Sequence, residues 1–223
     1  MNPTLALFGT PHYSLIVFGK LRQAGYPIVC VVTKPDQLLG RKQVLTPTPV
    51  ANWARENKYL LLTPASNPEK PWLYDDPDTF SKMLWENKPE LLITVDYTQK
   101  IPMNLVKQIK YGGLNIHPSL LPSYRGPAPV PWVILNGEKE TGVSIVTLSQ
   151  EFDAGQIVAQ EKEPVLPTDT TDILLTRLFQ KGAELLVGTL PKYLMSPTTY
   201  NVPASSARLD SAERAGGQPA TKS

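Results

Sequence analysis

The chain has 223 residues, of which 41% are hydrophobic and 19% charged, and its formal net charge is +2. This composition is ordinary for a soluble globular protein, and the small net charge gives no sign of general nucleic-acid binding. One cysteine excludes an internal disulfide, two histidines and one cysteine argue against the usual nitrogen and sulfur metal sites, and no apolar run reaches the ~20 residues that span a bilayer. We therefore expect a cytoplasmic protein that is not bound to a membrane and that needs neither a disulfide nor a metal ion to fold.

Short apolar runs alternate with helical patterns in the first half of the chain. This alternation predicts an α/β fold with a mostly parallel sheet and helices on both faces, and ligands of such sheets bind beyond the carboxyl ends of the strands. Residues 35–49 are predicted to form a polar loop centred on Gly40, Arg41 and Lys42, and residues 64–77 are predicted to be irregular. Strands are predicted over 4–8, 28–33, 59–62, 91–95 and 113–116, and helices over 12–24, 50–57, 78–87 and 102–110.

The second half has a different pattern. Residues 143–148 and 156–165 predict two more strands, which we expect to be antiparallel additions to the sheet. Residues 196–223 are dominated by Ser, Thr, Ala, Pro and Gly, so we expect one domain over 1–195 followed by a disordered tail. A long amphipathic helix is predicted over 169–190, with Ile173, Leu174, Leu178, Ala183, Leu186 and Leu190 facing the core.

Three polar residues from two distant segments carry the predicted chemistry. Asn115 and His117 are two positions apart, so on an extended strand they project to the same face, at the functional edge of the sheet. Pro118 keeps the chain extended there, and the prolines and glycine between 122 and 129 predict a stiff loop that forms one wall of a cleft. Asp153 precedes an Ala-Gly turn signal, which predicts a loop between two strands.

Together these groups suit acyl transfer from a carrier to an amine. Asn115 would donate to a developing oxyanion, His117 would stabilise the oxyanion or shuttle the proton of the amine, and Asp153 would orient and charge the imidazole. No serine or cysteine lies in a recognisable nucleophile elbow, which favours direct attack over an acyl-enzyme. Taken singly, each of the three residues is as well or better explained as a turn former or a structural residue, and their types alone indicate only a carbonyl site.

Longer motifs point to a family. Across residues 4–194, the chain resembles the folate-dependent formyltransferases, and it is most similar to the members that act on Met-tRNA. Several motifs in register at compatible spacing are more specific than one short pattern. They are Phe8-Gly-Thr-Pro11, Asn115-Ile-His-Pro-Ser-Leu-Leu-Pro-Ser-Tyr-Arg-Gly-Pro-Ala-Pro129, Trp132-Val-Ile-Leu-Asn-Gly-Glu138, Thr141-Gly-Val143, Asp153-Ala-Gly155, Leu166-Pro-Thr-Asp-Thr170 and Gly182-Ala183.

The resemblance implies a Rossmann-like formyltransferase fold, 10-formyltetrahydrofolate as donor and initiator Met-tRNA as acceptor. We also expect the chain to be a monomer. It implies that Asn115, His117 and Asp153 form the catalytic trio. By similarity, Arg41 and Lys42 would contact tRNA phosphates or base edges, although charge pattern alone favours a solvated loop. By the same similarity, Val95, Asp96, Tyr97, Ile101, Ser119, Leu120, Leu121 and Pro122 would contact the folate.

Two departures keep other functions open. Thr98 stands where the family usually has glycine, and residues 196–223 do not resemble the C-terminal β-barrel domain that helps the Met-tRNA enzymes hold tRNA. The alternatives are a sugar-nucleotide N-formyltransferase with the same trio, and an inactive folate-binding or tRNA-binding module. A glycinamide ribonucleotide formyltransferase is less favoured, because Gly9-Thr10-Pro11 lacks a glycine-rich phosphate cradle.

Overall fold

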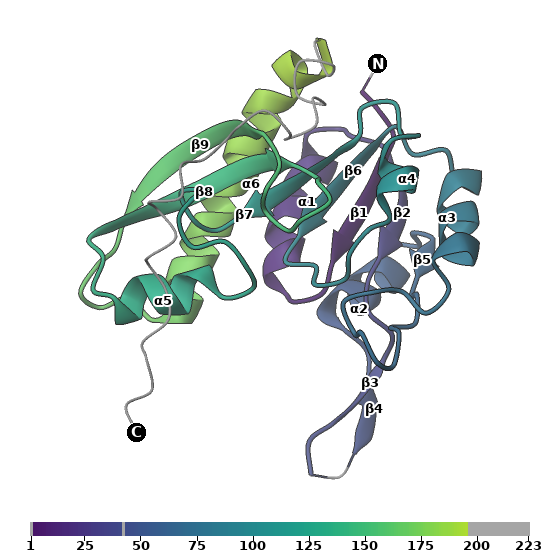
Figure 1. The fold of residues 1–223 in the computed structure, drawn as a ribbon, viewed down its shortest axis with the longest axis horizontal. Helices are drawn as coiled ribbons and strands as arrows, with labels where there is room; N and C mark the ends of the chain where they lie inside the picture. Colours follow the sequence, from purple (N-terminus) through teal and green to yellow (C-terminus); the bar gives the residue numbers. More distant parts are fainter. Residues whose placement is uncertain (1, 42, 196–223) are drawn as a thin grey trace.

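A seven-stranded sheet organises the protein, whose computed structural model describes residues 2–41 and 43–195. The strand order is β5-β2-β1-β6-β7-β8-β9; the first five strands are parallel, and β8 and β9 are each antiparallel to their neighbour (Figure 1). The predicted α/β fold with antiparallel additions is confirmed. The strands of this sheet are β1 Leu5–Gly9, β2 Ile28–Val32, β5 Leu61–Leu62, β6 Leu91–Val95, β7 Gly113–His117, β8 Glu140–Thr147 and β9 Ile157–Pro164.

Helices cover both faces of the sheet because its central strands are apolar on both sides. In β1, Leu5 and Leu7 pack into one core, and Ala6 and Phe8 pack into the other. The first core contains buried residues of α1, α2 and α6, and the second contains buried residues of α3 and α4. The helices are α1 Tyr13–Gln23, α2 Pro49–Glu56, α3 Pro77–Glu86, α4 Met103–Val106, α5 Pro129–Leu135 and α6 Thr171–Met195.

The polar loop predicted over 35–49 is wrong in part, because a β-hairpin forms there. Strands β3 (Gln37–Leu39) and β4 (Val44–Thr46) pair with each other and make a sheet of their own. Gly40 has φ +70°, which glycine adopts readily, and its carbonyl accepts from the Gln43 N–H at 3.1 Å. The hairpin projects away from the body of the molecule (Figure 1). Each strand has only three residues, so the alternation of apolar and polar residues is too short to predict a strand in a polar segment.

Three further predictions need correction. The stiff loop expected around Pro129 instead gives way to α5, which begins at that proline, since the first turn of a helix needs no N–H there. Helix α4 is shorter than the predicted span of 102–110. Ile173 is 49% exposed and does not face the core, whereas the other five predicted core residues of α6 are buried. Within the described ranges, no helix is long and apolar enough to cross a membrane, and the predicted tail lies outside those ranges.

Candidate active site

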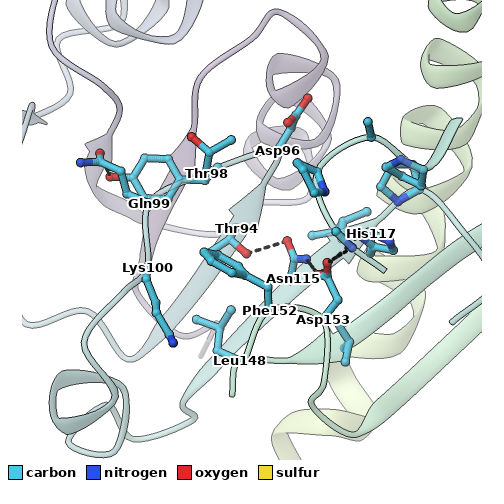
Figure 2. A pocket seen from close by; sticks show the side chains of 18 of the residues that line it. Thr94, Asp96, Thr98, Gln99, Lys100, Asn115, His117, Leu148, Phe152 and Asp153 are labelled. Carbon is cyan, nitrogen blue, oxygen red and sulfur yellow. Dashed lines mark hydrogen bonds and ion pairs between the residues drawn. The ribbon is translucent and has the colours of Figure 1, made fainter. Parts of the chain in front are cut away.

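A pocket of about 470 Å³ opens at the carboxyl ends of β6 and β7, where ligands of parallel sheets bind. The side chains that line it come from both halves of the chain (Figure 2). Polar groups gather around Asn115, and much of the remaining wall is apolar. The apolar residues include Trp72, Ile101, Met103, Leu148 and Phe152.

The three residues predicted to meet do meet at this pocket. Asn115 Nδ2 donates to Asp153 Oδ1 at 2.9 Å, and Nδ1 of His117 lies 3.4 Å from the same oxygen (Figure 2). The side chains of His117 and Asp153 are only 5% and 8% exposed, so their interaction is weakly screened by water. The structure therefore brings an amide, an imidazole and a carboxylate together, while their catalytic role stays a prediction.

The amide of Asn115 is held at both ends. Its Oδ1 accepts from the Thr94 hydroxyl at 2.7 Å, and its Nδ2 must face Asp153 because an ionised carboxylate can only accept. Thr94 lies directly opposite Asn115 in the pairing of β6 with β7. The second hydrogen of Nδ2 has no acceptor among the described residues. Sequence reasoning missed Thr94, because only the register of the two strands makes it a neighbour.

The imidazole of His117 is fixed by a backbone group as well as by Asp153. Its Nε2 lies 2.9 Å from the carbonyl oxygen of Tyr124. That oxygen can only accept, so Nε2 carries a hydrogen and Nδ1 is the nitrogen turned towards Asp153. His117 is the last residue of β7 rather than the first residue after it, as the predicted strand end implied.

Asp153 sits, as predicted, in the loop between β8 and β9. Its φ of +53° is a left-handed conformation that aspartate tolerates better than most residues. Its Oδ2 accepts from the Gly126 N–H at 3.1 Å, and Gly126 has φ +102°. A Cβ at Gly155 would lie 1.8 Å from the Thr147 carbonyl oxygen, so only glycine lets this loop fold so closely against β8.

The segment that follows β7 is anchored from behind the pocket. Ser144 of β8 donates to the Ser119 carbonyl at 2.6 Å and accepts from the Leu121 N–H, and Gln160 of β9 donates to the Leu121 carbonyl. The Ser119 hydroxyl donates to the Ser123 carbonyl, one residue before the Tyr124 carbonyl that contacts His117. The predicted folate contacts Ser119, Leu120, Leu121 and Pro122 lie outside the pocket lining, and two of them, Ser119 and Leu121, are hydrogen-bonded to β8 and β9.

The other predicted folate contacts are closer to the pocket. Asp96, Tyr97 and Ile101 line it, whereas Val95 is a buried strand residue whose carbonyl accepts from the Ser14 hydroxyl. Burial raises the pKa of the Asp96 carboxyl, and the charges of His117 and Lys34 pull it down.

Arg41, the predicted tRNA contact, is exposed in the turn of the β3–β4 hairpin, far from the hydrogen-bonded trio in sequence and on a different element. Lys42, its predicted companion, lies outside the described residues. The hairpin follows β2, so it extends beyond the carboxyl end of that strand, the same edge of the sheet that carries the pocket. Neither residue's contact with RNA is tested by this arrangement.

A mostly parallel α/β sheet, with a pocket at its carboxyl edge where an amide, an imidazole and a carboxylate meet, defines the class: a Rossmann-like α/β protein. Residues 4–190 match the family model described as formyl transferase, and the chain belongs to that family. The methionyl-tRNA formyltransferase of Enterococcus faecalis is 37% identical over 195 residues, which are 87% of this chain and 60% of that protein. The protein of the same name from Listeria monocytogenes is 39% identical with the same coverage. The chain thus spans 60% of the length of these relatives.

Solved structures support the fold. The phosphoribosylglycinamide formyltransferase from Anaplasma phagocytophilum superposes with a TM-score of 0.69 at 21% identity, over 86% of each chain. The phosphoribosylglycinamide formyltransferase from Bacillus halodurans gives a TM-score of 0.68 at 21% identity, over 89% of this chain and 100% of that one. Similarity at this identity shows the architecture and leaves the acceptor open.

Proposed function

We propose that this chain catalyses transfer of a formyl group from 10-formyltetrahydrofolate to the α-amino group of initiator Met-tRNA. The observation that carries the proposal is the convergence of Asn115, His117 and Asp153 on one side of a pocket large enough for a small-molecule donor. The names of the relatives that are 37–39% identical support Met-tRNA as the acceptor.

The pocket suits the proposed donor in size and in the chemistry of its wall. Flat aromatic rings bind well between apolar and aromatic side chains, and Trp72, Leu148 and Phe152 supply such a surface beside the trio. Residues Tyr97 to Ile101 line the same pocket, and their backbone groups can satisfy the polar edge of a heterocycle. When bound, the folate supplies an activated formyl group on nitrogen.

Asn115 provides the donor for the oxygen that gathers negative charge as the amine attacks. Thr94 and Asp153 fix both ends of its amide, and this leaves one Nδ2 hydrogen for the substrate. A donor held in place before the reaction needs no reorganisation in the transition state, which is why such groups are worth on the order of 10²–10³ in rate.

His117 and Asp153 handle the proton that the amine must lose. Because Nε2 is committed to the Tyr124 carbonyl, a proton can enter or leave the ring only at Nδ1. Asp153 faces that atom, so a proton taken up there forms an ion pair inside the pocket wall. The imidazolium would also lie beside the developing oxyanion and stabilise it. It would then return the proton to the folate nitrogen as the bond between that nitrogen and the formyl carbon breaks, so that tetrahydrofolate leaves and the imidazole is neutral again.

The hairpin β3–β4 is the proposed tRNA contact. It carries Arg41 at its exposed turn, and Leu38 and Leu45 on its strands are 57% and 62% exposed. A positively charged tip with uncovered apolar side chains suits the phosphates and bases of an acceptor stem. The charge of Lys42 would add to it.

We further infer that the chain acts in the cytoplasm as a monomer. The whole trio comes from a single chain, so a second copy is not needed to complete the site. Sedimentation velocity at working concentration measures this directly: a single species of 24.6 kDa is expected.

The proposed function is tested by offering the purified protein several acceptors with 10-formyltetrahydrofolate. Initiator Met-tRNA should be formylated by the wild type, and Asn115→Ala and His117→Ala should lose the activity while keeping the melting temperature. Turnover of an amino-sugar nucleotide or of glycinamide ribonucleotide, with none of Met-tRNA, would assign the rival acceptor. Folate binding by calorimetry without transfer to any amine would indicate a binding module.

A further inference from the structure

The side chain of Asp96 is not used by the chemistry described so far. It follows β6, it lines the pocket, and it adopts φ +49°. No described residue donates a hydrogen bond to its carboxylate or forms an ion pair with it. The charged groups that act on it are His117 and Lys34, and it acts in turn on the Tyr13 hydroxyl of α1. Because no protein group donates to this half-buried carboxylate, its oxygens are free to accept from a ligand in the pocket.

A second polar group with unmet hydrogen-bonding capacity occurs at the same sheet edge. Gly9 pairs with Val95, so Thr10 and Asp96 follow at neighbouring strand ends. The hydroxyl oxygen of Thr10 is buried and has no partner among the residues that the structure describes. Lys34 lies between β2 and the β3–β4 hairpin, and its charge acts on Asp96, so this corner lies at the sheet edge from which the hairpin extends.

This corner is separate from the place where the amine reacts. Figure 2 shows Asp96 and Leu148 on opposite sides of Asn115, with the carboxyl group of Asp96 turned away from Asn115 and Asp153. The apolar wall around Leu148 and Phe152 suits the rings of the donor. The Asp96 side is therefore left for the part of the acceptor that lies beyond its amino group.

We propose that Asp96 forms a hydroxyl-recognising subsite for the acceptor, and that its carboxylate accepts a hydrogen bond from the free ribose hydroxyl next to the aminoacyl linkage. This inference rests on the proposed function, since it takes an aminoacyl adenosine as the acceptor end. In such a molecule, that 2′-hydroxyl is the hydrogen-bond donor nearest to the amine apart from the amine itself. A carboxylate is a pure acceptor, so it fits a hydroxyl and does not fit the ester or thioether.

The test uses two stable acceptors, the methionyl amide of 3′-amino-3′-deoxyadenosine and its 2′-deoxy counterpart. Wild type should prefer the acceptor with the hydroxyl by about tenfold in kcat/KM, as expected for a hydrogen bond to a charged group. Calorimetric dissociation constants for both acceptors, measured without folate, should show the same preference. Asp96→Gly removes the carboxylate and tolerates the positive φ, so its preference should fall to about onefold.

Two controls separate recognition from a structural effect. Asp96→Asn keeps an acceptor oxygen in the same backbone conformation and should recover part of the preference. Glu151→Gln removes another carboxylate of the pocket lining and should leave the ratio of the two acceptors unchanged. An unchanged ratio in Asp96→Gly, or equal losses with both acceptors, overturns the inference while the proposed function stands. If the wild type neither binds nor formylates either acceptor, and Met-tRNA is also refused, both proposals fail.

Discussion

The pocket and the β3–β4 hairpin differ in how far their side chains are buried and hydrogen-bonded. In the pocket, every member of the trio is hydrogen-bonded or paired within the chain, and His117 and Asp153 are almost fully buried. On the hairpin, Val44 is 58% exposed, Leu45 is 62% exposed, and the exposed Arg41 has no ion-pair partner among the described residues. The hydrogen bonds of the pocket are formed before any substrate binds, whereas the exposed side chains of the hairpin are available to contact a partner. Changes in the pocket should therefore act on kcat, and changes in the hairpin on the KM for the large acceptor.

The largest effect is expected from His117→Ala. Loss of the imidazole removes both the proton acceptor and the positive charge beside the oxyanion, so kcat/KM should fall by on the order of 10³ or more. Initial rates of formyl transfer measure this. A normal melting temperature and normal folate affinity serve as controls, and retention of a tenth of the activity would contradict the proposed role.

Asp153→Asn should be the next most damaging change. The neutral amide no longer stabilises a positive charge on the imidazole, and it keeps only one of the two oxygens that accept from Asn115 and Gly126, so a loss of about 10²–10³ in kcat is expected. A pH–rate profile measures the effect. Full activity at every pH would show that the carboxylate does not assist His117.

Thr94→Val tests whether the hydrogen bond from the Thr94 hydroxyl to Asn115 Oδ1 holds the amide in its active position. Valine keeps the shape of threonine but frees Oδ1 of Asn115, and the misplaced amide should lower kcat by about tenfold. Thr94→Ser, which keeps the hydroxyl, should restore most of the rate. Equal losses in both variants would mean that packing rather than the hydrogen bond matters. The dissociation constant for folate should not change in either variant.

Arg41→Ala should affect only the acceptor. We expect the KM for Met-tRNA to rise by about three- to tenfold, with the KM for folate unchanged, since a lost phosphate contact weakens tRNA binding. Lys82→Ala removes another exposed positive charge, from α3, and is the matched control. A rise in the folate KM, or an equal effect of Lys82→Ala, would remove the hairpin from tRNA binding.

The smallest effect concerns folding. Leu45→Ser should change the free energy of unfolding by no more than about 0.5 kcal/mol, because this side chain is mostly exposed. Leu84→Ala, on the buried face of α3, should cost about 2–5 kcal/mol. Urea denaturation compares the two variants. A large loss in Leu45→Ser would mean that the hairpin packs on the body in solution, and the contrast between the regions would then fail.

Much of the fold can be predicted from the sequence because its strands and helices have clear hydrophobic patterns. The mostly apolar run in β6 and the alternation of strands with helices predicted a parallel sheet, and the Asp-Ala-Gly signal placed Asp153 in a loop. The hairpin escaped prediction because three-residue strands give little periodicity. Helix α5 is not predicted because prolines are more typical of loops, although a helix accepts proline in its first turn.

The sequence by itself determined which residues could act as donor, base and carboxylate, and that Asn115 and His117 share a face, because side-chain direction in a strand depends only on local geometry. Only the tertiary structure decided that Asp153 meets them, that Thr94 holds the amide and that the Tyr124 carbonyl holds the ring. Those contacts depend on strand register and on how loops far apart in the chain fold against one another. No local pattern in the sequence specifies either of these.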